Sequence, residues 1–416
     1  MNQGDRCPAN VRRAYGLAIL YALFIFATIP YTRPFQRFVY DRFGKAYFGY
    51  AVLLAIALCL VWGLSHLVKR ARRGAAPGNY AWLAGVAGAY VYFTLKLWQC
   101  PEEAIHFLEY GLLSFLCYRA LSRHVRDTTV YFTASLMVLF AGTIDEFIQW
   151  IVPDRVGSFR DVWINFLAGA LFQLGLWKGI RPAAISESIQ PGSVRILTAS
   201  GIACLVLLGL CASMTPPRVA LVSERISAFS HLRNKHHMMS EYGYRHEDPE
   251  AGAFYSRFTE QELKAIDRGK QEAHAAILNA HAQKPYGDFL KAYNTITAPF
   301  LYEMRIHLFR RDQYAWKGMK EKDSAKLEYQ TVAHRENLIL ERYFGQTLQR
   351  TVFQWPVGKK AEIETGSDRN RPYESPVSSD LITRFTEKGL WAGIGLLVCL
   401  LLAIHVRVGR LRHEAG

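Results

Sequence analysis

Apolar residues are concentrated in eight windows of about 20 residues, each long enough to cross the hydrocarbon core of a bilayer as a helix. The segments between the windows are short, except for one long polar stretch before the last window. This pattern predicts an all-α, multi-pass transmembrane bundle of about eight spans. The first window is long and leads into further spans, so we expect a retained anchor rather than a cleaved signal peptide. The windows are 14–32, 46–67, 80–97, 104–121, 129–151, 159–177, 194–214 and 389–406.

One segment, residues 144–169, combines membrane-like hydropathy with a high density of polar side chains. A charged residue at the centre of a membrane helix costs roughly 2.5 to 3.5 kcal/mol on insertion scales, so several together indicate a function. Their spacing of three or four residues places them on common helix faces. The polar residues of this segment are Asp145, Glu146, Gln149, Arg155, Arg160, Asp161 and Asn165.

A break divides the segment into two helices. Pro153 disfavours helical geometry in the residue before it, and Gly157 with Ser158 provides a turn before the next apolar window. We therefore expect two antiparallel membrane helices that share one polar end, with Ser158 as a cap for the helix beginning near Phe159.

These motifs resemble a known family. DEFIQ at 145–149 followed by PDRVGSFRDVWIN at 153–165 resembles the signature of the VanZ-like membrane proteins, a family named after a teicoplanin-resistance protein. HFLEYGLL at 106–113 is similar to the family's other sequence block, and the resemblance covers about 12–177. It implies a bacterial multi-pass membrane protein linked to envelope antibiotics, without a defined mechanism.

The chain differs from that pattern at two positions. Glu103 stands where many members carry a lysine three residues before the histidine, which removes a possible phosphate-binding cation. The small residue seven positions after Asp161 is Ala168, with Gly169 next to it, and this difference should be structurally mild.

The basic residues between the windows predict the orientation. Sixteen Lys and Arg residues flank one set of window ends and seven flank the other. By the positive-inside rule, both termini are cytoplasmic and the long polar stretch is extracytoplasmic. The net charge of +15 largely reflects these flanks, so it favours anionic lipid headgroups as partners over nucleic acid, for which no recognition motif is present. The first outer segment, 31–46, is basic and aromatic, and we interpret it as an interfacial loop.

This orientation brings the polar residues to one extracytoplasmic site and leaves three hypotheses open. In the first hypothesis, which is structural, the side chains only pack helices and cap their ends. In the second, they bind an anionic headgroup or a lipid-linked envelope precursor, with the acids orienting the arginines; the ligand-binding candidates are Gln149, Arg155, Ser158, Asp161 and Asn165. In the third, they form an enzyme site, as a general acid and base or as ligands of a divalent metal; the catalytic candidates are His106, Glu109, Asp145 and Glu146.

The polar stretch, 216–387, is long enough for one domain of its own. Thr259 with Glu262 forms a capping box before a helix over 260–282, and 301–316 and 326–350 also show helical periodicity. No strand pattern competes with these helices, and we interpret 357–379 as a linker. All seven cysteines lie outside this stretch, so its core must form without disulfides.

A histidine- and methionine-rich run in this stretch raises the question of a metal. His and Met are soft ligands, but no metal-ligand spacing recurs, so we predict no metal site, and no cofactor can be assigned. The residues concerned are His231, His236, His237, Met238, Met239, His246, His274 and His281.

The sequence thus predicts a VanZ-like transmembrane module over 1–215, a mainly helical extracytoplasmic domain over 216–387, and a final span with a short cytoplasmic tail over 388–416. The expected location is the bacterial inner membrane. The expected function is binding of a lipid headgroup or envelope precursor, with a possible link to glycopeptide resistance. The alternatives are a membrane enzyme acting on a lipid-linked substrate and an accessory protein for polysaccharide or protein export.

Overall fold

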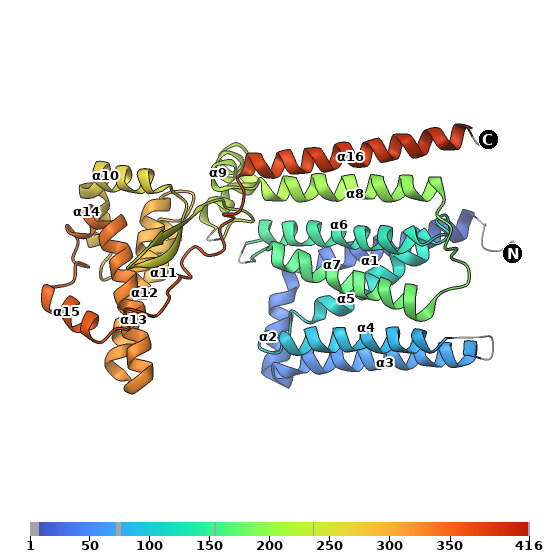
Figure 1. Ribbon diagram of the computed structural model, residues 1–416, viewed down its shortest axis with the longest axis horizontal. Coiled ribbons are helices and arrows are strands. Elements are labelled where there is room, and N and C mark those ends of the chain that lie inside the picture. Colours follow the sequence, from blue (N-terminus) through green and yellow to red (C-terminus); the bar gives the residue numbers. More distant parts are fainter. Residues whose placement is uncertain (1–7, 72–75, 154, 236, 415–416) are drawn as a thin grey trace. The chain divides into compact units, whose positions relative to one another are not determined.

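Helices form most of the chain, and each of the eight apolar windows overlaps a helix in the computed structural model (Figure 1). The structure describes residues 8–71, 76–153, 155–235 and 237–414. The chain divides into two compact units, residues 1–211 with 391–416 and residues 212–390, and each is described by itself.

Among the described residues of the first unit, all regular elements are helices, and an isolated β-bridge joins Asp127 and Ser186. Its elements are α1 (Pro8–Thr28), a 3₁₀ turn (Ile29–Tyr31), α2 (Thr32–Phe43), α3 (Ala46–Ala71), α4 (Pro77–Lys96), α5 (Ile105–Leu121), α6 (Thr129–Ile151), α7 (Phe159–Leu174), a π-helical turn (Gly175–Ile180), α8 (Pro191–Ala212) and the greater part of α16 (Glu387–Glu414).

Five helical segments among the described residues are long and apolar enough to cross a membrane: Ala9–Phe43, Ala46–Lys69, Thr129–Ile151, Pro191–Ala212 and Glu387–Val408. The other predicted spans correspond to α4, α5 and α7. Helix α5 has 17 residues and α7 has 16, and both pack inside the unit, where neighbouring helices replace lipid as their surroundings. The number of eight spans therefore stays a prediction.

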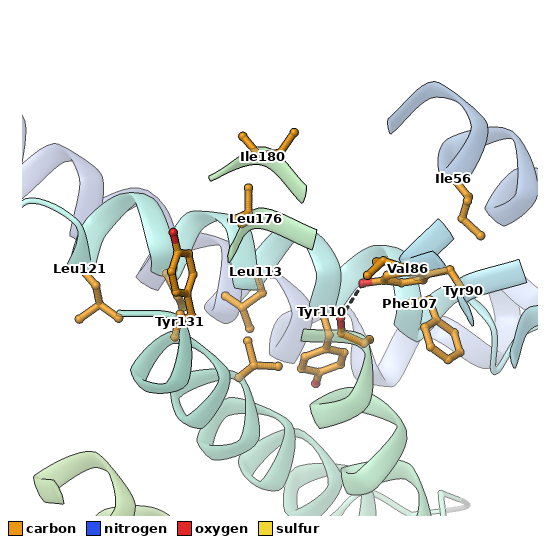
Figure 2. Packing of buried hydrophobic residues seen from close by; sticks show 14 of the residues in the cluster. Ile56, Val86, Tyr90, Phe107, Tyr110, Leu113, Leu121, Tyr131, Leu176 and Ile180 are labelled. Atoms are coloured by element: carbon orange, nitrogen blue, oxygen red, sulfur yellow. Dashed lines mark hydrogen bonds between the residues drawn. The ribbon is translucent and has the colours of Figure 1, made fainter. Parts of the chain in front are cut away.

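The core of this unit forms around α5. Phe107, Tyr110 and Leu113 on α5 are buried against α4, α6 and α7 (Figure 2). The Tyr90 hydroxyl on α4 donates to the carbonyl oxygen of Ala168 on α7 at 2.5 Å, the dashed bond in Figure 2. Such bonds between helices satisfy polar atoms where no water is available.

Helices α8 and α16 pair with each other although about 200 residues separate them in the chain. Thr198 Oγ1 lies 2.9 Å from His405 Nδ1, and a side chain at Gly209 would collide with Ile394. Cys204 donates to the carbonyl oxygen of Leu136, which ties α8 to α6. The last helix is therefore part of the membrane bundle.

The first outer segment is a helix and not the loop we expected. Helix α2 runs across the ends of α3 and α4 in Figure 1 and ends at Gly44, which has a positive φ of 80°. Phe35, Phe38, Val39 and Phe43 recur at helical spacing, but Pro34 stands within the first turn, so the sequence carries turn and helix signals together.

The second unit is also mainly helical. Its elements are α9 (Pro216–Arg225), a 3₁₀ segment (Ser227–Asn234), β1 (Tyr244–Asp248), β2 (Gly252–Ser256), α10 (Glu260–Ala280), α11 (Tyr286–Ala292), α12 (Pro299–Lys320), α13 (Asp323–Tyr343), α14 (Gly345–Leu348) and α15 (Val357–Thr365). The predicted capping box of Thr259 and Glu262 is present at the start of α10, and α12 and α13 confirm the two other predicted helices.

The hairpin of β1 and β2 corrects the expectation that this unit contains no strand. The two strands pair in antiparallel register from Tyr244 with Ser256 to Asp248 with Gly252. Each strand has five residues and β1 is polar and largely exposed, so neither shows the alternating pattern that identifies a strand. Asp248 accepts bonds from two backbone N–H groups of the turn, which stabilises it.

The expectation of a linker over 357–379 is also wrong. Residues 357–365 form α15, and the following segment enters the core of the unit. The Tyr373 hydroxyl and Ser375 Oγ both donate to Glu336 Oε1 on α13, at 2.6 and 2.7 Å. Composition indicated a linker because it does not reveal that a buried carboxylate requires these donors.

Candidate functional site

The polar residues of α6 lie on one buried face, as their spacing predicted. Gln149 Nε2 donates to Asp145 Oδ2 at 3.0 Å, one helical turn earlier, and to Glu146 Oε1 at 3.1 Å. All three residues are less than 9% exposed. The Gln149 side chain therefore links the two carboxyl groups inside the unit.

Gln149 also connects these acids to Arg155. Its Oε1 accepts a hydrogen bond from Arg155 Nη2, while its Nε2 serves the carboxyl groups. The Gln149 amide thus connects the arginine to the two acids. The hypothesis that the acids orient the arginine stays a prediction.

The break between α6 and α7 has the expected form. Helix α6 ends at Ile151, and Val152 adopts an extended conformation before Pro153. Ser158 caps α7: its Oγ accepts from Asp161 N at 3.1 Å, and its backbone N–H donates to Glu146 Oε2 at 3.1 Å. A side chain at Gly157 would collide with the carbonyl oxygen of Glu146, so only glycine allows this close return.

Helix α5 contributes His106, Glu109 and Tyr110. His106 Nδ1 lies 3.7 Å from Glu109 Oε2, and both side chains are partly exposed. Tyr110 is fully buried, and its hydroxyl interacts with the Asp145 carboxyl group, although no bond of ordinary length and angle joins the two. His106 and Glu109 also interact electrostatically with Asp145, so α5 and α6 face one another through these residues.

Asn165 on α7 completes the arrangement, and Gly142 on α6 makes room for it. A Cβ atom at Gly142 would lie 2.9 Å from Asn165 Cβ and 3.5 Å from Tyr110 Cε1. Side chains from α5 and α7 therefore converge at this glycine, one turn before Asp145. The sequence reasoning missed Gly142; its position three residues before Asp145 in AGTIDE was the available signal.

We call this set the polar cluster: His106, Glu109, Tyr110, Asp145, Glu146, Gln149, Arg155, Ser158, Asp161 and Asn165. All nine predicted site residues belong to it, and Tyr110 is added by the structure. Arg160 does not belong, because its 65% exposed side chain pairs with Glu103 at 2.9 Å on the surface.

The polar cluster is incompletely hydrogen-bonded. Within the described part of the chain, six of its buried side-chain atoms have no hydrogen-bond partner: His106 Nδ1, Tyr110 OH, Asp145 Oδ1, Asp161 Oδ1, and both Nδ2 and Oδ1 of Asn165. A buried polar group without a partner costs about 1 to 3 kcal/mol. Most buried polar atoms in proteins are paired with protein atoms or ordered water, so this concentration distinguishes the polar cluster from an ordinary contact between helices.

Two hydrogen bonds to Glu102 connect α2 to this region. Gln36 Nε2 donates to Glu102 Oε1 at 2.9 Å, and the Tyr40 hydroxyl donates to Glu102 Oε2. Glu102 lies directly before Glu103 and α5. Helix α2 is therefore attached next to the end of α5 at which His106 lies.

No set of three His, Cys, Asp or Glu side chains in the described residues is arranged to hold a metal ion. In the histidine- and methionine-rich run, Met238 and Met239 are buried, and His246 Nε2 lies 3.0 Å from the carbonyl oxygen of Phe258. His281 bonds to the carbonyl oxygen of Ile277, and His274 stacks on Phe300. His231 and His237 also have partners, whereas His236 lies outside the described residues.

A buried polar cluster among apolar helices, five segments of which are long and apolar enough to cross a bilayer, indicates a multi-helix membrane protein. The model of the VanZ/LLP1 family matches residues 14–181, so the predicted resemblance is confirmed and this part of the chain is a VanZ/LLP1-type module. The match contains the whole polar cluster and ends before α8. No curated protein and no solved structure matches the chain.

Proposed function

We propose that this protein binds a lipid headgroup or a lipid-linked envelope precursor in the polar cluster. The observation that supports this proposal is the set of six buried polar atoms without hydrogen-bond partners in the described part of the chain. A site used only for packing helices would be expected to satisfy these atoms internally, because no lipid tail can do so. A polar ligand that enters from the membrane surface can supply the missing bonds.

The proposed setting is the bacterial inner membrane, with about eight spans and both termini cytoplasmic. The excess of Lys and Arg at one set of window ends, sixteen against seven, supports this orientation. It gives the polar cluster access to the extracytoplasmic leaflet, where envelope precursors are used, and makes the second unit extracytoplasmic. A contribution to glycopeptide resistance would follow if ligand binding changed access of the antibiotic to its target.

Arg155 provides the direct test. Arg155→Gln keeps a polar side chain but removes the charge and the bidentate guanidinium, so lipid retention by the purified protein should fall while its thermal stability changes little. Arg160→Gln is the matched control, because Arg160 only pairs with Glu103 on the surface. If Arg155→Gln lowers stability and leaves lipid retention intact, the residue packs helices and the proposal fails.

Asp161→Asn is the companion variant. It keeps the size and hydrogen-bonding capacity of the side chain and removes its charge. Asp161 Oδ2 accepts from Ser158 Oγ at 2.8 Å, so the asparagine can keep the turn in place, whereas its ligand contacts would change. We expect weaker retention of lipid at normal membrane abundance.

An enzyme remains the second candidate because His106 Nδ1 is unpartnered and lies near Glu109. A general base contributes about 10² to 10⁴-fold to a rate. His106→Ala should then abolish turnover of a lipid-linked substrate and spare its binding. Unchanged turnover in this variant would remove the enzyme hypothesis.

A further inference from the structure

We propose that the headgroup bound by the polar cluster is zwitterionic, with its phosphate between Arg33 and Arg155 and its primary amine among the carboxyl groups of α5, α6 and α7. This inference rests on the proposed function and adds the chemical class of the ligand and a binding residue, Arg33 of α2.

The position of Arg33 follows from the attachment of α2. Gln36 and Tyr40 both bond to Glu102, which fixes the face of α2 directed toward the start of α5. Arg33 precedes these residues by three and seven positions, so it lies on the same helix face. Arg42, nine positions after Arg33, lies on the opposite face.

Arg33 and Arg155 form a site for an anion. The two guanidinium groups interact electrostatically, and this interaction is repulsive. Arg33 is exposed and has no ion pair within the described residues, while Arg155 is held in place through Gln149. A phosphate between them would change this repulsion into two attractive, charge-assisted contacts.

Inside the polar cluster, in contrast, acidic side chains outnumber basic ones. Four carboxyl groups lie there: Glu109 is next to His106, and Asp145, Glu146 and Asp161 interact with Arg155. The unpartnered oxygens include Asp145 Oδ1, Asp161 Oδ1 and Asn165 Oδ1, which all accept hydrogen bonds when the acids are ionised. A primary ammonium group brings a positive charge and three donors, so it matches both the charge and the bonding that this region lacks.

The two regions are close enough for one headgroup. A single side chain, Gln149, contacts Asp145 and Glu146 through its amide nitrogen and Arg155 through its oxygen. In an ethanolamine phosphodiester only two carbons separate the amine nitrogen from a phosphate oxygen, so both charges belong to one short headgroup.

Helix α2 also has the composition of a membrane-surface helix. Its Phe35 and Phe38 side chains are 58% and 61% exposed, and Arg33, Arg37 and Arg42 accompany them. Aromatic and basic residues together are typical of helices that lie among lipid headgroups. A phospholipid would meet Arg33 there before its headgroup reaches the polar cluster.

The test uses the full-length protein in detergent and native mass spectrometry with three added lipids of identical acyl chains. Phosphatidylethanolamine and phosphatidylcholine carry the same charges, but only the first has N–H donors; phosphatidylglycerol has the phosphate without a cation. We expect phosphatidylethanolamine to be retained at least about tenfold better than either, as loss of charged hydrogen bonds implies.

Variants separate the two subsites. Arg33→Gln should weaken binding of all three lipids, whereas Arg42→Gln should change none of them. Asp145→Asn should remove the preference for phosphatidylethanolamine and leave residual binding; if it fails to fold, Asp161→Asn serves the same purpose.

Two results would overturn the inference: equal retention of phosphatidylethanolamine and phosphatidylcholine, or an equal effect of Arg33→Gln and Arg42→Gln. If lipid binding still depends on Arg155 in those cases, the inference fails and the proposed function stands. If no lipid binding depends on Arg155, both fail.

Discussion

At the scale of single residues, the polar cluster depends on a few side chains with several simultaneous roles. Gln149 forms hydrogen bonds with two acids and an arginine. Glu146 accepts hydrogen bonds from the Gln149 side-chain amide and from the Ser158 backbone N–H. The sequence predicted these residues because polar side chains at membrane depth are rare and their spacing fixes their direction. It predicted Gly157 only as part of a turn and did not predict that Gly142 leaves space for Asn165, because a missing side chain gives little chemical signal.

Gly142 tests how tightly the polar cluster is packed. Gly142→Ala places a methyl group 2.9 Å from Asn165 Cβ, so we expect a loss of about 1 to 3 kcal/mol of stability together with weaker lipid binding. Gly88→Ala in α4 is the control, because nothing lies within 4 Å of its added Cβ and a helix normally gains from alanine. Thermal unfolding of both variants measures the difference; equal melting temperatures would contradict the described packing.

In the second unit, Glu336 is the side chain that makes several hydrogen bonds at once. It is fully buried and accepts bonds from His307, Tyr373 and Ser375. Burial alone would raise its pKa, but the charge of His307 and these hydrogen bonds outweigh burial and hold the pKa of Glu336 below its usual value.

The pKa of an unfolded glutamate is about 4.3, and that of Glu336 in the folded state is lower. Its ionised form therefore stabilises the fold fully above about pH 4.3, and this stabilisation is lost as the pH falls through the folded-state pKa. We expect the stability of this unit to fall as the medium is acidified below about pH 4.3. Glu336→Gln should cost about 3 kcal/mol or more at pH 7 and should weaken this acid dependence. Hydrogen exchange in α12 and α13, corrected for intrinsic rates, measures both; an unchanged acid dependence in the variant would refute the assignment.

At the scale of elements, hydropathy located the helices well and failed where tertiary contacts decide the structure. All eight apolar windows contain a helix, and the break at Pro153 occurs where predicted. Helix α2 and the β1–β2 hairpin were missed because α2 is fixed partly by Glu102 and the hairpin by its turn and its neighbours. The supposed linker after α15 is ordered by Glu336, from about 40 residues earlier in the chain.

The start of α7 offers a test at this scale. Ser158→Ala removes the N-cap and the bond to Asp161, which should cost about 1 kcal/mol. Ser158→Thr keeps the hydroxyl and should retain most of the stability. If alanine and threonine behave alike in thermal unfolding, the cap has no energetic role.

At the scale of the whole molecule, the chain combines a VanZ/LLP1-type module with helices α8 and α16 and a second unit inserted between them. Hydropathy alone predicts this order, because the polar stretch lies between two apolar windows. The role of the second unit could not be predicted, since its helices carry no motif and its buried charges serve its own core.

The proposed orientation has a direct consequence for this unit. A reporter fused near Lys291 should be active only outside the cytoplasm, because the basic residues concentrate on the side of the termini. A fusion near Lys69 should give the opposite signal. Cytoplasmic activity at Lys291 would reverse the orientation and place the polar cluster on the wrong leaflet for envelope precursors.

The most direct test of the central claim is an experimental structure of the full-length protein in nanodiscs of its native membrane lipids, at a resolution that shows ordered water. We predict continuous non-protein density that reaches Arg155 and lies within hydrogen-bonding distance of Asp145 Oδ1 and the Asn165 amide. A polar cluster whose unpartnered atoms bond only to each other or to isolated waters would contradict ligand binding and leave helix packing as its function.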